Sequence, residues 1–232
     1  MAANYFVNQY APMNNIDPHS DESIRRWLNN CAHYYEFEIG RYMPAQKDAA
    51  ILDLGCGIGG TIHYLNLNGF KNVTGIDKSE DQLAVCRKFV SKKVILADAV
   101  DYLKASTGNY GCIIALDLIE HLPKLLIPEF CNALFEALIP GGSIILKTPN
   151  MASLFAARSR YLDFTHEVGF TEESIRQILV TAGFQHIAAY NSFVGRKRIM
   201  LVSMFQRIAE KIYGVSPARV VTPNLIVIAK KL

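Results

Sequence analysis

Ile51-Leu52-Asp53-Leu54-Gly55-Cys56-Gly57-Ile58-Gly59-Gly60 is a short apolar strand that runs directly into a glycine-rich turn. Glycines at this spacing let the backbone turn sharply and approach a bound ligand closely. A helix is predicted to follow from Gly60 to Asn66. This order of strand, glycine turn and helix is typical of nucleotide-binding α/β proteins, although the motif alone does not separate dinucleotide enzymes from other classes.

Strand-like and helix-like segments alternate from about Ala49 onward, which predicts a parallel sheet with helical crossovers. Pro140-Gly141-Gly142 is expected to end the helix before the fifth strand. The last two strands are expected to form a terminal pair, because the segment between them lacks the usual crossover pattern. Predicted strands cover residues 49–54, 72–76, 94–97, 111–116, 143–147, 185–190 and 224–229, and the clearest helices cover residues 79–90 and 171–182. The sequence thus predicts a doubly wound α/β fold.

The composition is that of a folded protein. The chain has 232 residues and a net charge of +3, half of its residues are hydrophobic, and 19% are charged, which favours one large domain. No apolar run approaches ~20 residues, so no membrane-spanning helix is predicted. No basic and apolar leader opens the chain, and the five cysteines, Cys31, Cys56, Cys86, Cys112 and Cys131, form no Cys-x-x-Cys pair. We therefore expect a cytoplasmic protein with free thiols.

Three aspartates lie at the ends of strands that are predicted to be neighbours. Asp53 precedes the glycines, Asp77 ends the second strand, and Asp98 closes the third. Asp77, about 20 residues after the glycine turn, is placed to accept hydrogen bonds from a ribose diol, and Asp98 from an adenine amino group. Such carboxylates repel a pyrophosphate and attract a cationic amino-acid tail. The plainer alternative is that each acid ends a strand in solvent, and Asp101 is close enough to replace Asp98.

In combination, these motifs resemble those of class I S-adenosylmethionine-dependent methyltransferases. The resemblance covers residues 49–232 and also rests on Leu116-Asp117-Leu118-Ile119-Glu120-His121 and Pro140-Gly141-Gly142-Ser143. It implies a seven-stranded, mostly parallel Rossmann-like sheet with an antiparallel last strand, S-adenosylmethionine as cofactor and S-adenosylhomocysteine as product. The cofactor-binding residues that it implies are Asp53, Gly55, Cys56, Gly57, Gly59, Asp77, Lys78, Asp98, Ala99 and Asp117.

Two segments stand outside the alternation. Residues 1–45 are a predicted N-terminal helical elaboration, and residues 46–232 form the methyltransferase domain with an inserted helix near residues 198–213. The elaboration includes an amphipathic helix with Trp27, Tyr34, Tyr35 and Phe37, and such additions normally cover the pocket at the carboxyl ends of the strands. The inserted helix is unusually apolar. We expect it to be buried against the sheet or in a homodimer, and membrane-surface contact is the alternative for a lipid-linked acceptor.

His166 and His121 are the candidate catalytic histidines. His166 lies in a long polar and aromatic loop before the predicted helix at 171–182, and Asp163, three residues earlier, is placed to orient its imidazole. We expect His166 to act as a general base, whereas a hydrogen-bond network that braces the loop is the structural alternative. His121 follows the fourth strand and is expected to form a wall of the pocket, with a catalytic role left open.

The acceptor is expected to be a small molecule. Residues 161–171 also resemble a feature of bacterial methyltransferases of surface polysaccharides and other sugar-containing products, which implies O-methylation of a sugar or glycosylated intermediate. No metal is assigned, although Asp117, Glu120, Asp163 and Glu167 leave one open. A nucleic-acid partner is not expected, because no basic run is long enough. Two alternatives stay open: a nicotinamide-dependent oxidoreductase or epimerase, and a non-catalytic scaffold that binds S-adenosylmethionine.

Overall fold

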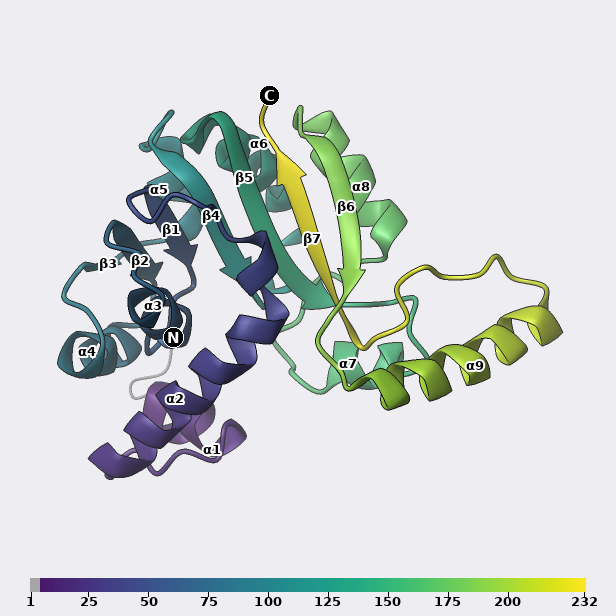
Figure 1. Ribbon diagram of the computed structural model, residues 1–232, viewed down its shortest axis with the longest axis horizontal. Helices are drawn as coiled ribbons and strands as arrows, with labels where there is room; N and C mark the ends of the chain where they lie inside the picture. The colour runs from purple at the N-terminus through teal and green to yellow at the C-terminus, as the bar shows by residue number, and fades with distance from the viewer. Residues whose placement is uncertain (1–4) are drawn as a thin grey trace.

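A seven-stranded sheet in the order β3-β2-β1-β4-β5-β7-β6 organises the protein, as seen in a computed structural model that describes residues 5–232 (Figure 1). Strands β1 to β5 pair in parallel, and β7 runs antiparallel to both β5 and β6. The strands are β1 (Ile51–Leu54), β2 (Val73–Asp77), β3 (Val94–Leu96), β4 (Tyr110–Leu116), β5 (Leu138–Pro149), β6 (Gln185–Asn191) and β7 (Asn224–Lys230). The predicted doubly wound fold with a terminal pair is confirmed. The described residues do not include residues 1–4. These four residues belong to the N-terminal stretch where no leader is predicted.

Helices cover both faces of the sheet because successive strand residues point to opposite sides. On one face, Leu52 and Leu54 belong to a core shared with residues of α5 (Ala99–Lys104), α6 (Ile127–Ala137) and α8 (Glu172–Thr181). On the other face, Ile51 belongs to a core with residues of α3 (Gly60–Leu67) and α4 (Glu80–Phe89). Burial on both faces explains why the central strands are apolar almost throughout.

Most predicted boundaries differ from the observed ones by a few residues, and two of these differences have a clear physical cause. The third strand ends at Leu96, because Asp98 already serves as the N-cap of α5: its carboxylate accepts the Val100 N–H at 2.8 Å. Helix α6 ends at Ala137, before Pro140 is reached, because Leu138 is already extended and opposite Tyr110 in the sheet. Pro140-Gly141-Gly142 therefore lies within β5 and does not end the helix.

The N-terminal segment consists of η1 (Phe6–Tyr10), α1 (Ala11–Met13), α2 (Asp21–Glu38) and η2 (Gly40–Tyr42). Glu38, at the end of α2, is buried, and its carboxylate accepts hydrogen bonds from the hydroxyls of Tyr34 and Ser192, each at 2.6 Å. It also accepts the N–H of Phe193. These contacts tie the end of α2 to the segment that follows β6, although the two lie far apart in the sequence.

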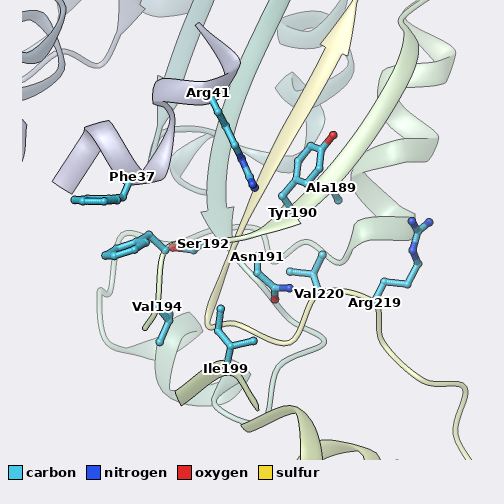
Figure 2. Close-up of a pocket in the computed structure, with 11 residues that line it drawn as sticks. Phe37, Arg41, Ala189, Tyr190, Asn191, Ser192, Val194, Ile199, Arg219 and Val220 are labelled. Carbon is cyan, nitrogen blue, oxygen red and sulfur yellow. The ribbon is translucent and has the colours of Figure 1, made fainter. Parts of the chain in front are cut away.

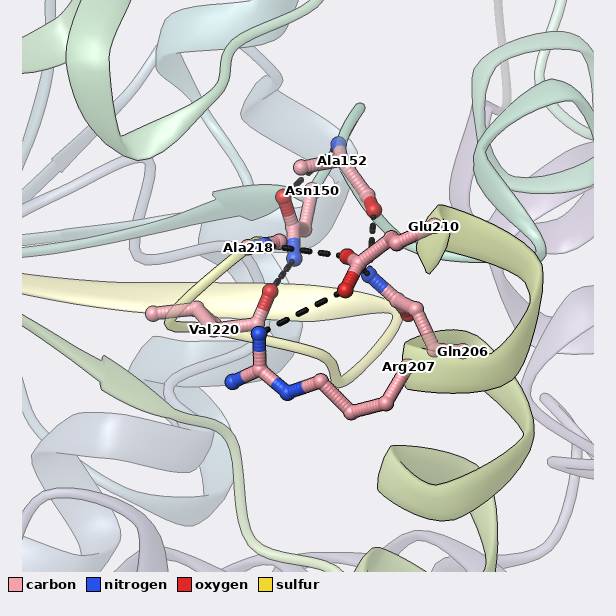
Figure 3. A network of polar contacts seen from close by, with 7 residues as sticks. All are labelled: Asn150, Ala152, Gln206, Arg207, Glu210, Ala218 and Val220. Carbon is pink, nitrogen blue, oxygen red and sulfur yellow. Dashed lines mark hydrogen bonds and ion pairs between the residues drawn. The ribbon is translucent and has the colours of Figure 1, made fainter. Parts of the chain in front are cut away.

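Helix α9 (Arg196–Tyr213) is the inserted helix, and it extends away from the sheet at the lower right of Figure 1. Its inward contacts are polar: the Gln206 amide donates to the carbonyl of Ala152 at 2.9 Å, and the Glu210 carboxylate accepts the Ala218 N–H at 2.9 Å (Figure 3). Its large apolar side chains are exposed, namely Met200, Leu201, Met204, Phe205, Ile208 and Ile212. The expected burial of this helix against the sheet is therefore wrong, because the sheet side of α9 is held by buried polar groups instead.

None of the helices in the described residues is long and apolar enough to cross a membrane. All five cysteines are free, as predicted.

Candidate functional site

A cavity of about 920 Å³ opens at the carboxyl ends of the central strands, where the predicted cofactor motifs lie. Its walls come from the strand ends, the N-terminal helices and the loop around α7 (Ala156–Tyr161). Nine predicted site residues line it: Asp53, Gly55, Cys56, Asp77, Lys78, Asp117, His121, Asp163 and His166. Gly57, Gly59, Asp98 and Ala99 do not line it. A smaller hollow beside Arg41 and Tyr190 is lined by none of the predicted residues (Figure 2).

Gly57 and Gly59 shape the glycine loop from outside the cavity. Their φ angles are +52° and +91°, a region that side chains with a Cβ rarely adopt. A Cβ on Gly57 would lie 2.7 Å from Oε1 of Gln82, and one on Gly59 would lie 2.5 Å from Sγ of Cys86. Both positions therefore need glycine for conformation and for close packing against α4.

Asp77 holds this loop and also faces the cavity. Its carboxylate accepts the N–H of Gly57 at 2.9 Å and the N–H of Ser79 at 2.8 Å. Each carboxylate oxygen has a second lone pair, so hydroxyl groups of a ligand can still donate to it. Asp77 is therefore both a structural residue of the loop and a candidate ligand-binding residue.

Asp53 is the most deeply buried acid of the cofactor motif. It is 2% exposed, and among the described residues its Oδ2 has no hydrogen-bond partner. Burial, and then the nearby charge of Asp77, raises the pKa of Asp53 well above its usual range. An unpartnered carboxylate oxygen at the wall of a cavity suits a cationic group of a ligand.

Asp117 forms an ion pair with Lys147, whose Nζ lies 2.8 Å from its Oδ2. Lys147 is buried in β5, whereas the Asp117 side chain is half exposed. Burial lowers the pKa of Lys147, but the Asp117 carboxylate outweighs this effect and leaves the pKa above its usual value. Asp117 was predicted as a cofactor residue, whereas Lys147 was not predicted as a site residue, although Lys147 carries the one charge among the strand residues predicted at 143–147.

His121 and His166 lie side by side at the cavity wall, with ring centroids 4.8 Å apart. His121 belongs to η3 (Ile119–His121), just before η4 (Lys124–Leu126), and its Nδ1 lies 2.9 Å from the hydroxyl of Thr165. That hydroxyl donates to Asp163 at 2.7 Å, because a carboxylate can only accept. His121 must therefore donate its Nδ1–H to Thr165. His166 likewise donates its Nδ1–H to the carbonyl of Ser159 at 3.1 Å, so both neutral imidazoles present a free lone pair on Nε2.

The predicted orientation of His166 by Asp163 is not observed. Helix α7 ends at Tyr161, so the two residues do not share a helical turn. The Asp163 carboxylate instead closes a local turn by accepting the Thr165 N–H at 2.8 Å, and it orients His121 through the Thr165 hydroxyl.

Glu120 lies next to the two histidines and is almost completely buried, at 1% exposure. Neither of its carboxylate oxygens has a hydrogen-bond partner among the described residues. Burial, and then the charge of Asp117, raises the pKa of Glu120 above its usual range, while burial and then His166 lower the pKa of His121. One ligand atom each from Glu120, His121 and His166 lie within 4.8 Å of one another, so these three residues are able to hold a metal ion.

The N-terminal helices supply much of the remaining wall. Trp27, Tyr34 and Tyr35 of α2 line the cavity, as does Tyr10 of η1. These three residues of α2 were named, together with Phe37, on the predicted amphipathic helix, but no pattern marked Tyr10. Gln82 was also missed; it lines the cavity from α4, and its Oε1 has no partner within the described chain.

The fold and the cavity together define the class of protein. A doubly wound sheet that carries acids at the ends of β1 and β2, beside a glycine loop, is the architecture of class I S-adenosylmethionine-dependent methyltransferases. A family model described as a methyltransferase domain matches residues 20–189, and the chain belongs to this family. This membership excludes the nicotinamide-dependent alternative and makes S-adenosylmethionine the cofactor of the site.

Curated relatives match the chain over part of their length. A ubiquinone biosynthesis O-methyltransferase of Hydrogenovibrio crunogenus is 30% identical over 52% of this chain and 53% of its own length. The sterol 24-C-methyltransferase of Saccharomyces cerevisiae is 26% identical over 53% of this chain and 32% of its own length. Phosphoethanolamine N-methyltransferase 1 of Zea mays is 31% identical over 63% of this chain and 29% of its own length. The chain thus spans about half or less of these relatives.

Solved structures share the fold. A SAM-dependent methyltransferase from Archaeoglobus fulgidus has a TM-score of 0.66 at 20% identity, covering 99% of this chain and 100% of that chain. Phosphoethanolamine N-methyltransferase 2 of Haemonchus contortus, solved with S-adenosyl-L-methionine, has a TM-score of 0.64 at 17% identity, covering 100% of this chain and 60% of that chain. At this level of identity the likeness concerns the fold alone.

Proposed function

We propose that the protein transfers a methyl group from S-adenosylmethionine to a hydroxyl oxygen of a small-molecule acceptor, with a sugar or glycosylated intermediate as the expected class. By their names, the relatives methylate oxygen, carbon and nitrogen, so they leave the acceptor atom open. The choice of oxygen rests on the residues of this chain at the far wall of the cavity.

The cofactor end of the cavity is formed by the glycine loop and its neighbouring acids. Asp53, with its unpartnered Oδ2, would bind the ammonium group of the cofactor, and Asp77 would accept hydrogen bonds from the ribose hydroxyls. When bound, the cofactor supplies an electrophilic methyl group on a cationic sulfur. The described part of the N-terminal elaboration, residues 5–45, would close the cavity over it through Trp27 and Tyr35 and so exclude water.

The observation that carries the proposal is the paired Nε2 lone pairs of His121 and His166. Each imidazole is held by a hydrogen bond from its Nδ1–H, so its other nitrogen is an acceptor at the wall of the same cavity. A hydroxyl group brought there has acceptors for its proton, and the loss of that proton makes the oxygen a better nucleophile. Asn224, Thr165 and the aromatic Tyr34 line the same cavity and suit a polyhydroxylated acceptor.

The test uses cofactor labelled with ¹³C in its methyl group and a panel of sugar nucleotides, phenols and amines. We expect product only from hydroxyl compounds, with the ¹³C chemical shift of an O-methyl group. His166→Ala should lower kcat by roughly 10²-fold while the Kd for S-adenosylhomocysteine stays unchanged. His33→Ala, which removes an exposed histidine of α2, is the matched control. An N-methyl or C-methyl product, or a His166→Ala variant with unchanged kcat, would contradict the proposal.

A further inference from the structure

We propose that Glu120, His121 and His166 form a binding site for one divalent transition-metal cation in the acceptor half of the cavity. Two imidazole nitrogens with one carboxylate are a donor set typical of zinc and of first-row metals such as manganese and iron, whereas magnesium and calcium prefer oxygen ligands. The three ligand atoms lie within 4.8 Å of one another, so small side-chain rotations bring them to one ion.

The hydrogen bonds behind the two histidines are those that a metal site requires. A metal-bound histidine normally donates its other N–H to a carbonyl, a carboxylate or water, which fixes the ring and leaves one nitrogen for the metal. His166 donates to the Ser159 carbonyl, and His121 donates to the Thr165 hydroxyl, which is itself bonded to Asp163. Both rings are thereby fixed with Nε2 as the free nitrogen.

Glu120 supplies an independent observation. Only 1% of Glu120 is exposed, and its two carboxylate oxygens lack hydrogen-bond partners within the described chain. Leaving such a group unpaired is costly, and a bound cation removes that cost. The backbone carbonyl of Glu120 also accepts the N–H groups of Glu167 at 2.7 Å and Val168 at 3.1 Å. This pairing anchors the loop of His166 directly against Glu120, so the three ligands are held together before a cation arrives.

The role of the cation rests on the proposed O-methylation. A hydroxyl oxygen that binds at an open coordination position loses its proton more readily, and the proton passes to solvent while the cation stabilises the oxyanion. In the metal-loaded protein both Nε2 lone pairs bind the cation, which then activates the hydroxyl. In the metal-free protein the same lone pairs accept the hydroxyl proton, as in the proposed function.

Metal binding is tested apart from activity. Protein stripped with EDTA is titrated calorimetrically with ZnCl₂, MnCl₂ and MgCl₂, and bound metal is counted by elemental analysis after desalting. We expect one equivalent of zinc or manganese and at least tenfold weaker magnesium binding. His166→Ala and Glu120→Gln should each weaken binding at least 100-fold, and His33→Ala should not change it. Thr165→Val keeps all three ligands but removes the hydroxyl behind His121, so it should weaken binding about tenfold.

The outcomes separate this site from the proposed function. Stripped protein that binds neither zinc nor manganese, or binding that survives both His166→Ala and Glu120→Gln, overturns the metal site. Hydroxyl methylation at full rate in stripped protein overturns the catalytic role proposed for the cation and leaves O-methylation standing. Stoichiometric binding that depends on these ligands supports the site, even where metal-loaded protein methylates no hydroxyl compound and O-methylation itself fails.

A separate surface leads to a second proposal: we infer that α9 docks on an anionic membrane surface. Its exposed face carries Met200, Leu201, Met204, Phe205, Ile208 and Ile212. The same helix contains Lys197, Arg198, Arg207 and Lys211, while its one acid, Glu210, is buried (Figure 3). Apolar side chains among cations, without exposed acids, match the interface of an anionic bilayer. Two copies of this face would bring like charges together, which disfavours self-association.

The position of α9 links this surface to the cavity. Gln206 bonds the carbonyl of Ala152, so α9 lies against the segment that leads into α7. That segment exposes Leu154 and Phe155, and Leu162, just beyond α7, is exposed and also lines the cavity. A docked protein would thus present its cavity close to the membrane, where a lipid-linked acceptor resides.

Vesicle sedimentation tests the docking surface. We expect the protein to sediment with phosphatidylcholine vesicles that contain phosphatidylglycerol, not with pure phosphatidylcholine, and to be released by high salt. Phe205→Glu with Ile208→Glu should reduce binding at least tenfold, whereas Leu125→Glu, at a still more exposed leucine of η4, should not. Absence of sedimentation overturns the proposal. A dimer in light scattering that Phe205→Glu converts to monomer also overturns it, because a second copy then covers the face.

Discussion

Replacing Asp77 by alanine tests the cofactor end of the site most directly. The substitution removes the acceptor of two backbone N–H groups, those of Gly57 and Ser79, at 2.9 and 2.8 Å. A hydrogen bond to a charged group contributes roughly 1.5–3 kcal/mol, so the two together amount to about 3–6 kcal/mol. Because about 1.4 kcal/mol corresponds to a factor of ten, a loss at the low end already weakens cofactor binding by roughly 100-fold.

Calorimetric titration with S-adenosylhomocysteine measures this loss, and urea unfolding shows how much of it falls on the stability of the free protein. Asp77→Asn keeps the size of the side chain but offers one acceptor oxygen, so its Kd should lie between those of wild type and Asp77→Ala. Asp101→Ala removes an exposed acid of α5 that does not line the cavity and serves as the control. If Asp77→Ala binds the cofactor product as tightly as the wild type, Asp77 neither holds the loop nor contacts the ligand.

Three further predictions concern groups that the structure places in defined surroundings. The raised pKa of Asp53 means that the folded apo-protein keeps a proton there from about pH 4 up to that pKa, so stability falls as pH rises through this window. Cofactor binding should then release a proton, seen as a dependence of the calorimetric heat on buffer ionisation, and Asp53→Asn should abolish that dependence. Asp117→Asn should lower the free energy of unfolding by about 3 kcal/mol, because it leaves the buried Lys147 unpaired. Lys147→Met leaves a half-exposed acid and should lower it by less than about 1 kcal/mol. Urea unfolding measures both losses, and equal losses would contradict this asymmetry. Thr171→Ala should cost about 1 kcal/mol, since Thr171 and Ser174 form a capping box at the start of α8, and an unchanged Tm would refute this cap.

The fold and the cofactor half of the site could be predicted because local sequence specifies them. A buried parallel strand is apolar throughout, and its end is marked by a polar residue, so Asp53 and Asp77 were visible as strand ends. The start of the helix predicted at residues 171–182 was visible for a similar reason: a capping signal and the helix that it starts are adjacent in sequence. The strand boundary was predicted wrongly next to Asp98, because a strand-end carboxylate and a helix N-cap look alike in sequence, while the role of Asp98 toward the adenine stays a prediction.

The acceptor half of the cavity could not be predicted in the same way, because its contacts join residues that are distant in sequence. Thr165 orients His121 across 44 residues, and no periodicity connects them. Lys147 pairs with Asp117 across 30 residues, and Asp117 has a positive φ, which no sequence pattern marks. The predicted contact between Asp163 and His166 is not formed. Their three-residue spacing was interpreted as a helical turn, whereas the chain forms a local turn in which Asp163 accepts hydrogen bonds from Thr165.

Charge explains why the two halves of the cavity belong to one site. Asp53, Asp77, Asp117 and Glu120 line the same cavity, and Lys147 neutralises Asp117 alone. Of these four acids, Asp53 and Glu120 are the most buried, and they are the ones with unpartnered oxygens; Asp53 lies near the end of β1, and Glu120 follows β4. A cavity with this distribution is completed by a positive charge at each end, since a buried carboxylate without a partner is costly. The cationic cofactor supplies one of them at Asp53. A positive charge beside Glu120, from the acceptor or from a bound metal, would favour the ionised carboxylate in the same way, and this is the physical reason to look for a metal beside the two histidines.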